Sequence, residues 1–374
     1  MKSHKVEELR NVSVISHSGA GKTSLTEAML FNTGAINRLG RVDDGTTVSD
    51  YDPEEVRRKI SVSTSVVPWE WDSYKVNLLD TPGYADFVGE VKGAIRVADG
   101  AVVVVCATSG VEVGTELVWE YADERKLPRL VFVNKMDREN SSLEHTLEQL
   151  RAKFPATFLL LQAPVGSHAS FKGVIDLLSM KAYMGDGSKP SEVPAELREE
   201  AQALRQQVID AAAEADDELI VKYLDGVELT AGEVQQGLSK AIASGKIVPV
   251  FCGSATLNIG VRQLQQGIVD YLPSPLATVA VAKNLRGNSE QNLKPDPAGP
   301  LAALVFKTMA DPYVGKLTYY RVYSGAMQSD SRVTNANKNE EERVGQLFYL
   351  TGKEQTPTKE VIAGDIGAVA KLQQ

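Results

Sequence analysis

Short runs of β-branched and aliphatic residues recur along the first two thirds of the chain, and helical stretches separate most of them. We expect strands at Val12–Ile15, Lys75–Leu79, Ala101–Cys106, Leu130–Val133, Phe158–Leu161 and Val248–Phe251. Helices are expected near Thr23–Phe31, Phe87–Val97, Thr115–Arg125 and Leu143–Phe154. Strands that alternate with helices pair in parallel, and the helices then cover both faces of the sheet. The sequence therefore predicts an α/β fold with a doubly wound sheet.

A long interval separates the last two of these strands, so we expect a subdomain inserted at about residues 166–246. Within it, one apolar stripe runs along a helix that begins near Pro194. A second helix opens at Thr230, with Glu233 at the spacing of a capping box. Because nothing in this segment has catalytic spacing, we expect a small α/β lobe with a structural or partner-facing role.

A domain boundary is expected at Leu272-Pro273-Ser274-Pro275, because two closely spaced prolines end the helix predicted at Arg262–Tyr271 and stiffen a linker. The chain is thus divided into residues 1–275 and residues 276–374. The sequence of residues 276–374 predicts a small β-barrel, since runs of strand-forming residues alternate there with turns. Its strands are expected at Leu301–Lys307, Leu317–Tyr323, Arg332–Asn335, Glu342–Tyr349 and Gly367–Leu372.

The composition argues against several classes of protein. The chain has 374 residues, with 40 basic and 49 acidic side chains and a net charge of −9, so we expect no DNA partner. The amino terminus alternates charges, and no apolar run approaches the roughly 20 residues of a membrane span. A cytoplasmic protein without a membrane partner is therefore expected. Cys106 and Cys252 lack the spacing of a metal site.

A phosphate-binding loop is indicated by Ser-His-Ser-Gly-Ala-Gly-Lys-Thr at residues 16–23, between the first strand and a helix. Glycines let successive N–H groups point at phosphate oxygens, and the helix terminus adds its positive end. Lys22 would reach the β- and γ-phosphates, and the Thr23 hydroxyl would bind Mg²⁺. The strict motif begins with glycine where this chain has Ser16, so an accidental turn stays open on this motif alone. The nucleotide-binding residues expected here are His17, Ser18, Gly19, Ala20, Gly21, Lys22, Thr23 and Ser24.

A second motif, Asp80-Thr81-Pro82-Gly83, ends the strand expected at Lys75–Leu79. An acidic residue at the carboxyl end of a strand can hold the water shell of Mg²⁺, and Asp80 is expected in that role. The Gly83 amide can donate a hydrogen bond to the γ-phosphate. Strand, carboxylate and glycine therefore follow one another in the order that a nucleotide site requires.

Two further motifs point to guanine as the base. Asn134-Lys135-Met136-Asp137 follows a strand, and the Asp137 carboxylate would accept hydrogen bonds from N1–H and the 2-amino group of guanine, which adenine does not offer. After the last strand of the sheet, the backbone of Gly253-Ser254-Ala255 could reach guanine O6. All four motifs follow strands at the edge where open α/β sheets bind ligands. The base-side residues expected to bind nucleotide are Asn134, Lys135, Asp137, Ser254 and Ala255.

The chain resembles translational GTPases, and most closely the first two domains of elongation factor G. The resemblance covers nearly the whole chain, and its most specific parts are Asp270–Pro275, Pro300–Lys307 and Ala310–Leu317. It implies a P-loop GTPase fold with an inserted α/β lobe, followed by an all-β barrel as domain II. It also implies GTP, GDP and Mg²⁺ as ligands, and the ribosome as partner of a monomeric factor, through ribosomal RNA and stalk proteins.

Three departures from the family's usual residues affect the site. Gly19 stands where the family commonly has an aspartate. Ser61, in the switch segment (residues 57–64), replaces a threonine that binds Mg²⁺, and the serine hydroxyl is expected to bind it equally. Tyr84 replaces the histidine that positions the attacking water, and a phenol cannot simply substitute for imidazole at neutral pH. Lys22 and Gly83 are the other residues expected to take part in catalysis. Because Tyr84 replaces the histidine, slow hydrolysis of GTP is expected.

The resemblance implies a GTP-hydrolysing translation factor that acts on the ribosome, in translocation or a related step. A ribosome-protection factor or a release- or recycling-type factor would share both domains and stays open. A second alternative is a GTP-gated binding module with negligible hydrolysis, because Tyr84 replaces the usual histidine. Relatives continue with further domains beyond the position of Gln374, so a fragment without those domains is expected.

Overall fold

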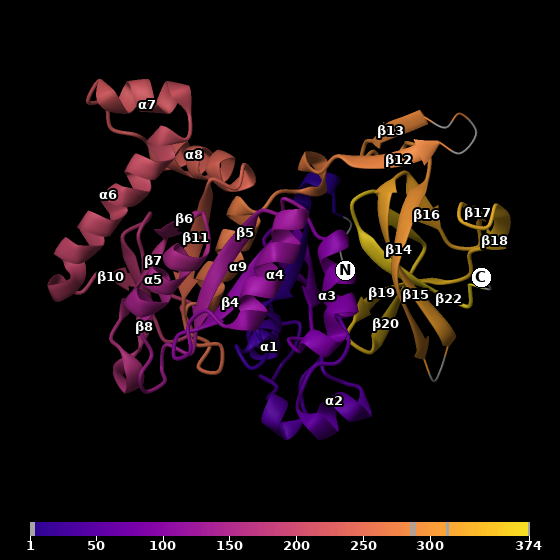
Figure 1. Ribbon diagram of the computed structural model, residues 1–374, viewed down its shortest axis with the longest axis horizontal. Helices are drawn as coiled ribbons and strands as arrows, with labels where there is room; N and C mark the ends of the chain where they lie inside the picture. The colour runs from indigo at the N-terminus through magenta and orange to yellow at the C-terminus, as the bar shows by residue number, and fades with distance from the viewer. Residues whose placement is uncertain (1–3, 285–286, 288, 312–313, 373–374) are drawn as a thin grey trace.

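The computed structural model describes residues 4–284, 287, 289–311 and 314–372. Figure 1 shows a large sheet with helices on both faces, and a β-rich domain (residues 302–370, orange to yellow) on its right. A lobe with three helices projects from the opposite side of the sheet (Figure 1). The predicted combination of an α/β domain, an inserted lobe and an all-β domain is therefore confirmed.

The main sheet has the strand order β2-β3-β1-β4-β5-β11-β6, and every neighbouring pair except β2 with β3 is parallel. All six predicted strands of the sheet are present. Its seventh strand, β2, was not predicted because Pro68 interrupts the run, and proline is tolerated there because β2 lies at the edge of the sheet. The strands are β1 (Leu9–Ile15), β2 (Ser65–Trp71), β3 (Tyr74–Asp80), β4 (Gly100–Cys106), β5 (Arg129–Asn134), β6 (Thr157–Leu160) and β11 (Ile247–Cys252).

Two apolar cores lie on opposite faces of this sheet. On one face pack α1 (Lys22–Asn32) and α9 (Val261–Tyr271), through side chains such as Leu25 and Leu264. On the other face pack α3 (Val88–Arg96), α4 (Val113–Glu124) and α5 (Leu143–Lys153). A short helix, α2 (Pro53–Arg58), lies in the long loop between α1 and β2, and Asp52 caps its amino terminus. No described helix combines the length and the apolar character that a membrane crossing requires.

The inserted lobe combines an antiparallel sheet with three helices. Its strands are β7 (Gln162–Val165), β8 (Gly173–Asp176), β9 (Lys181–Met184) and β10 (Pro190–Glu192). Its helices are α6 (Arg198–Glu214), α7 (Asp217–Leu224) and α8 (Ala231–Ala243). The predicted capping box is present, because the Thr230 hydroxyl accepts a hydrogen bond from the Glu233 backbone N–H. The helix predicted to begin near Pro194 begins instead at Arg198, after a short 3-10 turn.

The β-rich domain contains a five-stranded antiparallel sheet and two short two-stranded antiparallel pairs. The predicted single strand Glu342–Tyr349 is wrong, because residues 344–346 lie outside any strand and separate β18 from β19, which belong to different sheets. The sheet consists of β14 (Ala302–Asp311), β15 (Gly315–Ser324), β22 (Ile366–Ala370), β19 (Leu347–Thr351) and β20 (Glu354–Thr358). The pairs are β16 (Ala326–Gln328) with β21 (Glu360–Ile362), and β17 (Arg332–Asn335) with β18 (Glu340–Arg343). A further hairpin, β12 (Ala280–Asn284) with β13 (Ser289–Leu293), precedes the domain.

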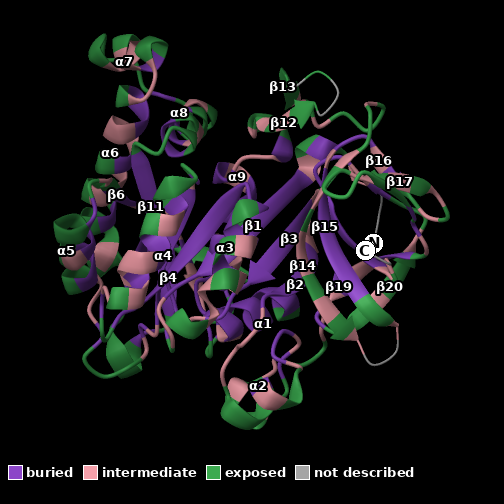
Figure 2. Cartoon of the chain, turned by 45° about the vertical axis from the view of Figure 1, so that its right-hand side comes forward, coloured by how far each residue is buried: buried purple, intermediate pink, exposed green. Residues whose placement is uncertain are grey.

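Most strands of the main sheet are buried (Figure 2). Buried ion pairs join this sheet and the β-rich domain. The Lys75 ammonium on β3 lies 2.7 Å from the Asp365 carboxylate, and Asn77 donates a second hydrogen bond to Asp365. The Arg321 guanidinium on β15 lies 2.8 Å from Asp99. Since charges are costly to bury without a partner, each pair fixes the contact between the two domains.

Replacing Asp365 with alanine is expected to destabilise the protein by about 3 to 5 kcal/mol, because the Lys75 ammonium would stay buried without its counter-ion. Thermal unfolding measures the effect. The control is Glu341→Ala, which breaks an exposed pair with Arg332 and should cost less than about 1 kcal/mol. Equal midpoints for the two variants would contradict the structural importance of the buried pair.

Candidate nucleotide-binding site

The phosphate-loop motif forms a tight turn between β1 and α1. Gly19 and Gly21 both have positive φ, at 78° and 98°, which side-chain-bearing residues rarely adopt. The Lys22 ammonium bends back over the loop and donates hydrogen bonds to the Ser16 hydroxyl at 2.8 Å and to the His17 carbonyl at 3.3 Å. Ser16, the departure from the strict motif, is therefore an acceptor for the loop's lysine.

A pocket of about 350 Å³ opens beside this loop at the carboxyl ends of the parallel strands. It collects residues from the first three predicted motifs, together with the switch segment and the loop after α1, while the Gly253–Ala255 motif is represented only by the next residue, Thr256. Asp80, Asn134 and Asp137 do not line this pocket themselves. The residues expected from the sequence that line it are Ser18, Gly19, Gly21, Lys22, Thr23, Ser24, Ser61, Gly83, Tyr84 and Lys135. It is large enough for a ligand with several polar groups, and its walls supply both hydroxyls and positive charge.

Asn134 and Lys135 brace the phosphate loop. The Asn134 amide donates to the Ala20 carbonyl at 2.9 Å, and its oxygen accepts from the Ala255 N–H at 2.9 Å. Lys135, with φ of 65°, donates from its ammonium to the Gly19 carbonyl at 2.7 Å. These bonds tie the ends of β5 and β11 to the loop after β1.

Asp137 carries a buried carboxylate oxygen that no described residue hydrogen-bonds. Its Oδ1 is buried and has no hydrogen-bond partner among the described residues, while Oδ2 lies 3.7 Å from Arg138 Nε. Leaving such an acceptor unpaired is unfavourable, so the arrangement suits a ligand that brings donors. The N1–H and amino group of guanine have this character.

Ser254 and Ala255 lie next to Asn134, but their backbone N–H groups are already used. The Ser254 N–H donates to the Ile259 carbonyl, and the Ala255 N–H donates to Asn134. A hydrogen bond from Ala255 to guanine O6 would therefore share or replace the bond to Asn134.

At the other end of the pocket, oxygen-bearing side chains gather around Thr23. The Thr23 and Ser61 hydroxyl oxygens lie 3.1 Å apart, and Asp80 accepts a hydrogen bond from Ser49 at 2.8 Å. The other oxygen of Asp80 is buried without a partner among the described residues. Burial, and then the nearby charge of Asp50, raises the pKa of the Asp80 carboxyl. Hydroxyls and carboxylates are the ligands that Mg²⁺ prefers, so these residues fit that ion.

Asp50 belongs to the same end of the pocket, although no sequence pattern selects it. Its buried carboxylate lies beside the Ser61 and Thr23 hydroxyls, and one of its oxygens has no hydrogen-bond partner in the described part of the chain. Burial raises the pKa of this carboxyl as well. Asp50 follows no parallel strand and matches no motif, so only the folding of the loop over the pocket identifies it.

Gly83 and Tyr84 lie where the Asp80 motif meets the phosphate loop. A Cβ atom on Gly83 would stand only 2.6 Å from the Lys22 nitrogen and 2.7 Å from Ser18 Cα, so only glycine fits. Tyr84 is 43% exposed and lines both this pocket and an adjoining apolar cavity. The His17 ring points away to the start of α4, where its Nδ1 accepts from the Gly114 N–H at 3.2 Å.

The fold and these motifs define a P-loop GTPase domain followed by a β-rich domain, and comparisons with known proteins agree. Residues 7–274 match the model of the elongation factor Tu GTP binding domain, and residues 300–374 match elongation factor G domain 2. A crystal structure of a protein from Thermus thermophilus is similar with a TM-score of 0.86 and 36% sequence identity over 98% of this chain. The chain belongs to the family of translation-factor GTPases with an elongation factor G-type second domain. It spans about half, 52%, of the Thermus chain.

Proposed function

We propose that the chain binds GTP and GDP with Mg²⁺ in this pocket and hydrolyses GTP on the ribosome, as an elongation factor G-like translation factor. The observation that carries the proposal is the buried, unpartnered Oδ1 of Asp137, which no other described residue satisfies. Membership of the family supports nucleotide binding, and the oxygen-lined opposite end of the pocket supports a cation. The factor is proposed to act in the cytoplasm as a monomer.

The residues divide into three groups by their proposed contacts. Lys22 would neutralise the β- and γ-phosphates, the Gly83 N–H would donate to the γ-phosphate, and the loop amides would bind the remaining oxygens. Thr23 and Ser61 would bind Mg²⁺ directly, and Asp80 would hold it through water. When bound, Mg²⁺ would offset the phosphate charge. Asp137 would read the base, with Asn134 and Lys135 holding the loop beneath it.

Hydrolysis would depend on how the attacking water is placed. Tyr84 is the residue at the position where the sequence suggests water positioning, and it stands at the edge of the pocket. Its phenol is a poor proton acceptor at neutral pH, so we propose a low intrinsic rate that the ribosome raises. If Tyr84 prevents useful hydrolysis, the same pocket would serve a GTP-gated binding module.

Ribosomal RNA and the stalk proteins are the proposed partners. Arg57 and Arg58 have exposed side chains beside the pocket. Exposed basic residues of this kind can bind the phosphate backbone of RNA, although the protein as a whole has a negative net charge. Translocation or a related step is the proposed activity. A ribosome-protection or recycling-type role uses the same two domains and stays the alternative.

A binding titration tests the first part of the proposal. GTP and GDP should bind in the presence of Mg²⁺, while ATP should bind far more weakly because it lacks the donors that Asp137 requires. Chelation of Mg²⁺ should weaken GTP binding, since the phosphate charges would then face Asp50 and Asp80 without a cation. Equal affinity for ATP and GTP would refute the assignment of the base site.

Lys22→Ala is expected to weaken GTP binding about 10- to 100-fold, because it removes a charge-assisted contact of about 1.5 to 3 kcal/mol. Lys246→Ala is the control, since this exposed lysine lies between α8 and β11. Titration with a fluorescent GTP analogue measures both variants. Unchanged affinity in Lys22→Ala would refute the phosphate-loop assignment.

A further inference from the structure

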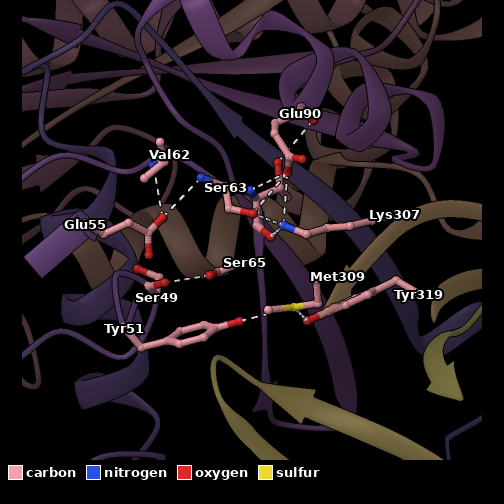
Figure 3. A network of polar contacts seen from close by, with 11 residues as sticks. Ser49, Tyr51, Glu55, Val62, Ser63, Ser65, Glu90, Lys307, Met309 and Tyr319 are labelled. Atoms are coloured by element: carbon pink, nitrogen blue, oxygen red, sulfur yellow. Dashed lines mark hydrogen bonds and ion pairs between the residues drawn. The ribbon is translucent and has the colours of Figure 1, made fainter. Parts of the chain in front are cut away.

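One lysine of the β-rich domain reaches into the switch segment. The Lys307 ammonium, on β14, donates hydrogen bonds to the Ser63 hydroxyl and, at 2.6 Å, to the Thr64 carbonyl (Figure 3). It also lies 3.0 Å from the Glu90 carboxylate on α3. Its side chain is only 7% exposed, so these three partners replace the water that the charge has lost.

The same short segment is held from two other directions. Glu90 accepts a hydrogen bond from the Thr64 N–H at 2.7 Å, and Glu55 on α2 accepts from the N–H groups of Val62 and Ser63 at 2.9 and 3.1 Å (Figure 3). Residues 62–64 lie outside any helix or strand and are held mainly by side chains of α2, α3 and β14. Such a segment keeps its shape only while the surrounding side chains stay in place.

β14 also contacts the beginning of residues 49–65, the part of the loop that carries α2 and the switch segment. The Tyr51 hydroxyl lies 3.6 Å from the Met309 sulfur, and the Tyr319 hydroxyl lies 3.0 Å from the same atom. The Ser65 hydroxyl donates to the Ser49 carbonyl at 2.6 Å and closes the loop (Figure 3). One strand of the β-rich domain thus touches both ends of the loop that carries α2.

Both ends of this loop are next to the residues at the cation end of the pocket. Asp50 precedes Tyr51, and Ser61 precedes the residues that Lys307 and Glu90 hold. Glu90 lies on the helix that follows Gly83 and Tyr84. Lys307 therefore connects the β-rich domain to both segments that would meet the γ-phosphate.

We propose that Lys307 is a positioning residue through which the docked β-rich domain favours the GTP-bound arrangement of the switch segment. The inference rests on the proposed nucleotide binding. The γ-phosphate would draw Ser61 and Gly83 inward, and Lys307 would favour the same arrangement, whereas GDP makes neither contact. If Lys307 favours the GTP-bound arrangement, it raises the affinity of the protein for GTP. By linkage, bound GTP favours the contacts of Lys307 by the same factor.

The test compares affinities for GDP and for a non-hydrolysable GTP analogue in the wild type and in Lys307→Met and Ser63→Ala. Lys307→Met should lose about 5- to 20-fold in affinity for the GTP analogue relative to GDP, at the lower end of known allosteric couplings. Ser63→Ala removes one hydroxyl and should shift the ratio in the same direction by less. If Lys307→Met does not fold, the affinity ratio of Ser63→Ala alone tests whether the contacts of Lys307 favour the GTP-bound state.

Arg321→Met is the matched control, because it removes another buried cation that joins the β-rich domain to the main sheet, through Asp99. It should lower the melting temperature without changing the ratio of affinities. The inference is overturned if Lys307→Met and Ser63→Ala keep the wild-type ratio, or if Arg321→Met shifts the ratio equally. A wild-type protein that binds neither nucleotide would instead refute the proposed function itself.

Discussion

Replacing Asp137 with asparagine should move the nucleotide preference of the protein from GTP to xanthosine triphosphate. The change substitutes an amide donor for a carboxylate oxygen, which then opposes the amino group of guanine but suits the 2-oxo group of xanthine. Two charge-assisted hydrogen bonds would be lost, so GTP affinity should fall about 10²- to 10⁴-fold. Competition between the two nucleotides in a binding assay measures the preference.

A second aspartate provides the control for this experiment. Asp43 is an exposed residue that lines the same pocket but belongs to none of the predicted base-binding motifs, and Asp43→Asn makes the same chemical change there. It should keep the preference for GTP. If Asp137→Asn also prefers GTP, the unpartnered carboxylate does not read the base.

Tyr84→His is expected to raise GTP hydrolysis on the ribosome without changing GTP affinity. Imidazole titrates near neutral pH and can hold a water for in-line attack, whereas the phenol of tyrosine titrates near pH 10. Positioning by a general base is worth about 10²- to 10⁴-fold in rate, and a pocket adapted to tyrosine should recover part of this. Single-turnover hydrolysis separates the chemical step from binding.

Tyr84→Phe distinguishes the hydroxyl of Tyr84 from its ring. Tyr84 also lines an apolar cavity together with Val88 and Leu117, so its ring can contribute there without its hydroxyl. We expect Tyr84→Phe to hydrolyse GTP at the wild-type rate, since the phenol hydroxyl contributes little to the positioning of the attacking water. An unchanged rate in Tyr84→His would show that the ribosome orients the water by itself, and Tyr84 would then not lower the rate.

Most of the main sheet could be predicted because its strands are continuous β-branched runs, as in Ala101–Cys106. β2 could not be predicted because Pro68 interrupts an otherwise apolar run, and β19 of the β-rich domain lies against it only in the folded chain. The division of the predicted strand Glu342–Tyr349 into β18 and β19 was missed because the three residues between them do not interrupt the strand-forming pattern. These failures lie at edges and bends, where tertiary contacts decide the conformation.

The candidate site could be predicted wherever its residues follow a parallel strand, because the carboxyl ends of such strands meet at one edge. Asp50, Glu55 and Lys307 do not follow such strands, and they reach the pocket or the switch segment only through folded loops and a second domain. The direction of the His17 ring also depends on α4, which lies far along the chain. Roles for the predicted site residues stay predictions until the variants are measured.

The most direct test of the proposed function is single-turnover hydrolysis of GTP by the wild-type protein, with and without ribosomes. We expect slow hydrolysis by the protein alone, a clear acceleration by ribosomes, and no comparable hydrolysis of ATP. Tight GTP binding without hydrolysis under either condition would contradict the assigned enzymatic activity and favour a GTP-gated binding module. Hydrolysis that ribosomes do not accelerate would contradict the proposed action on the ribosome.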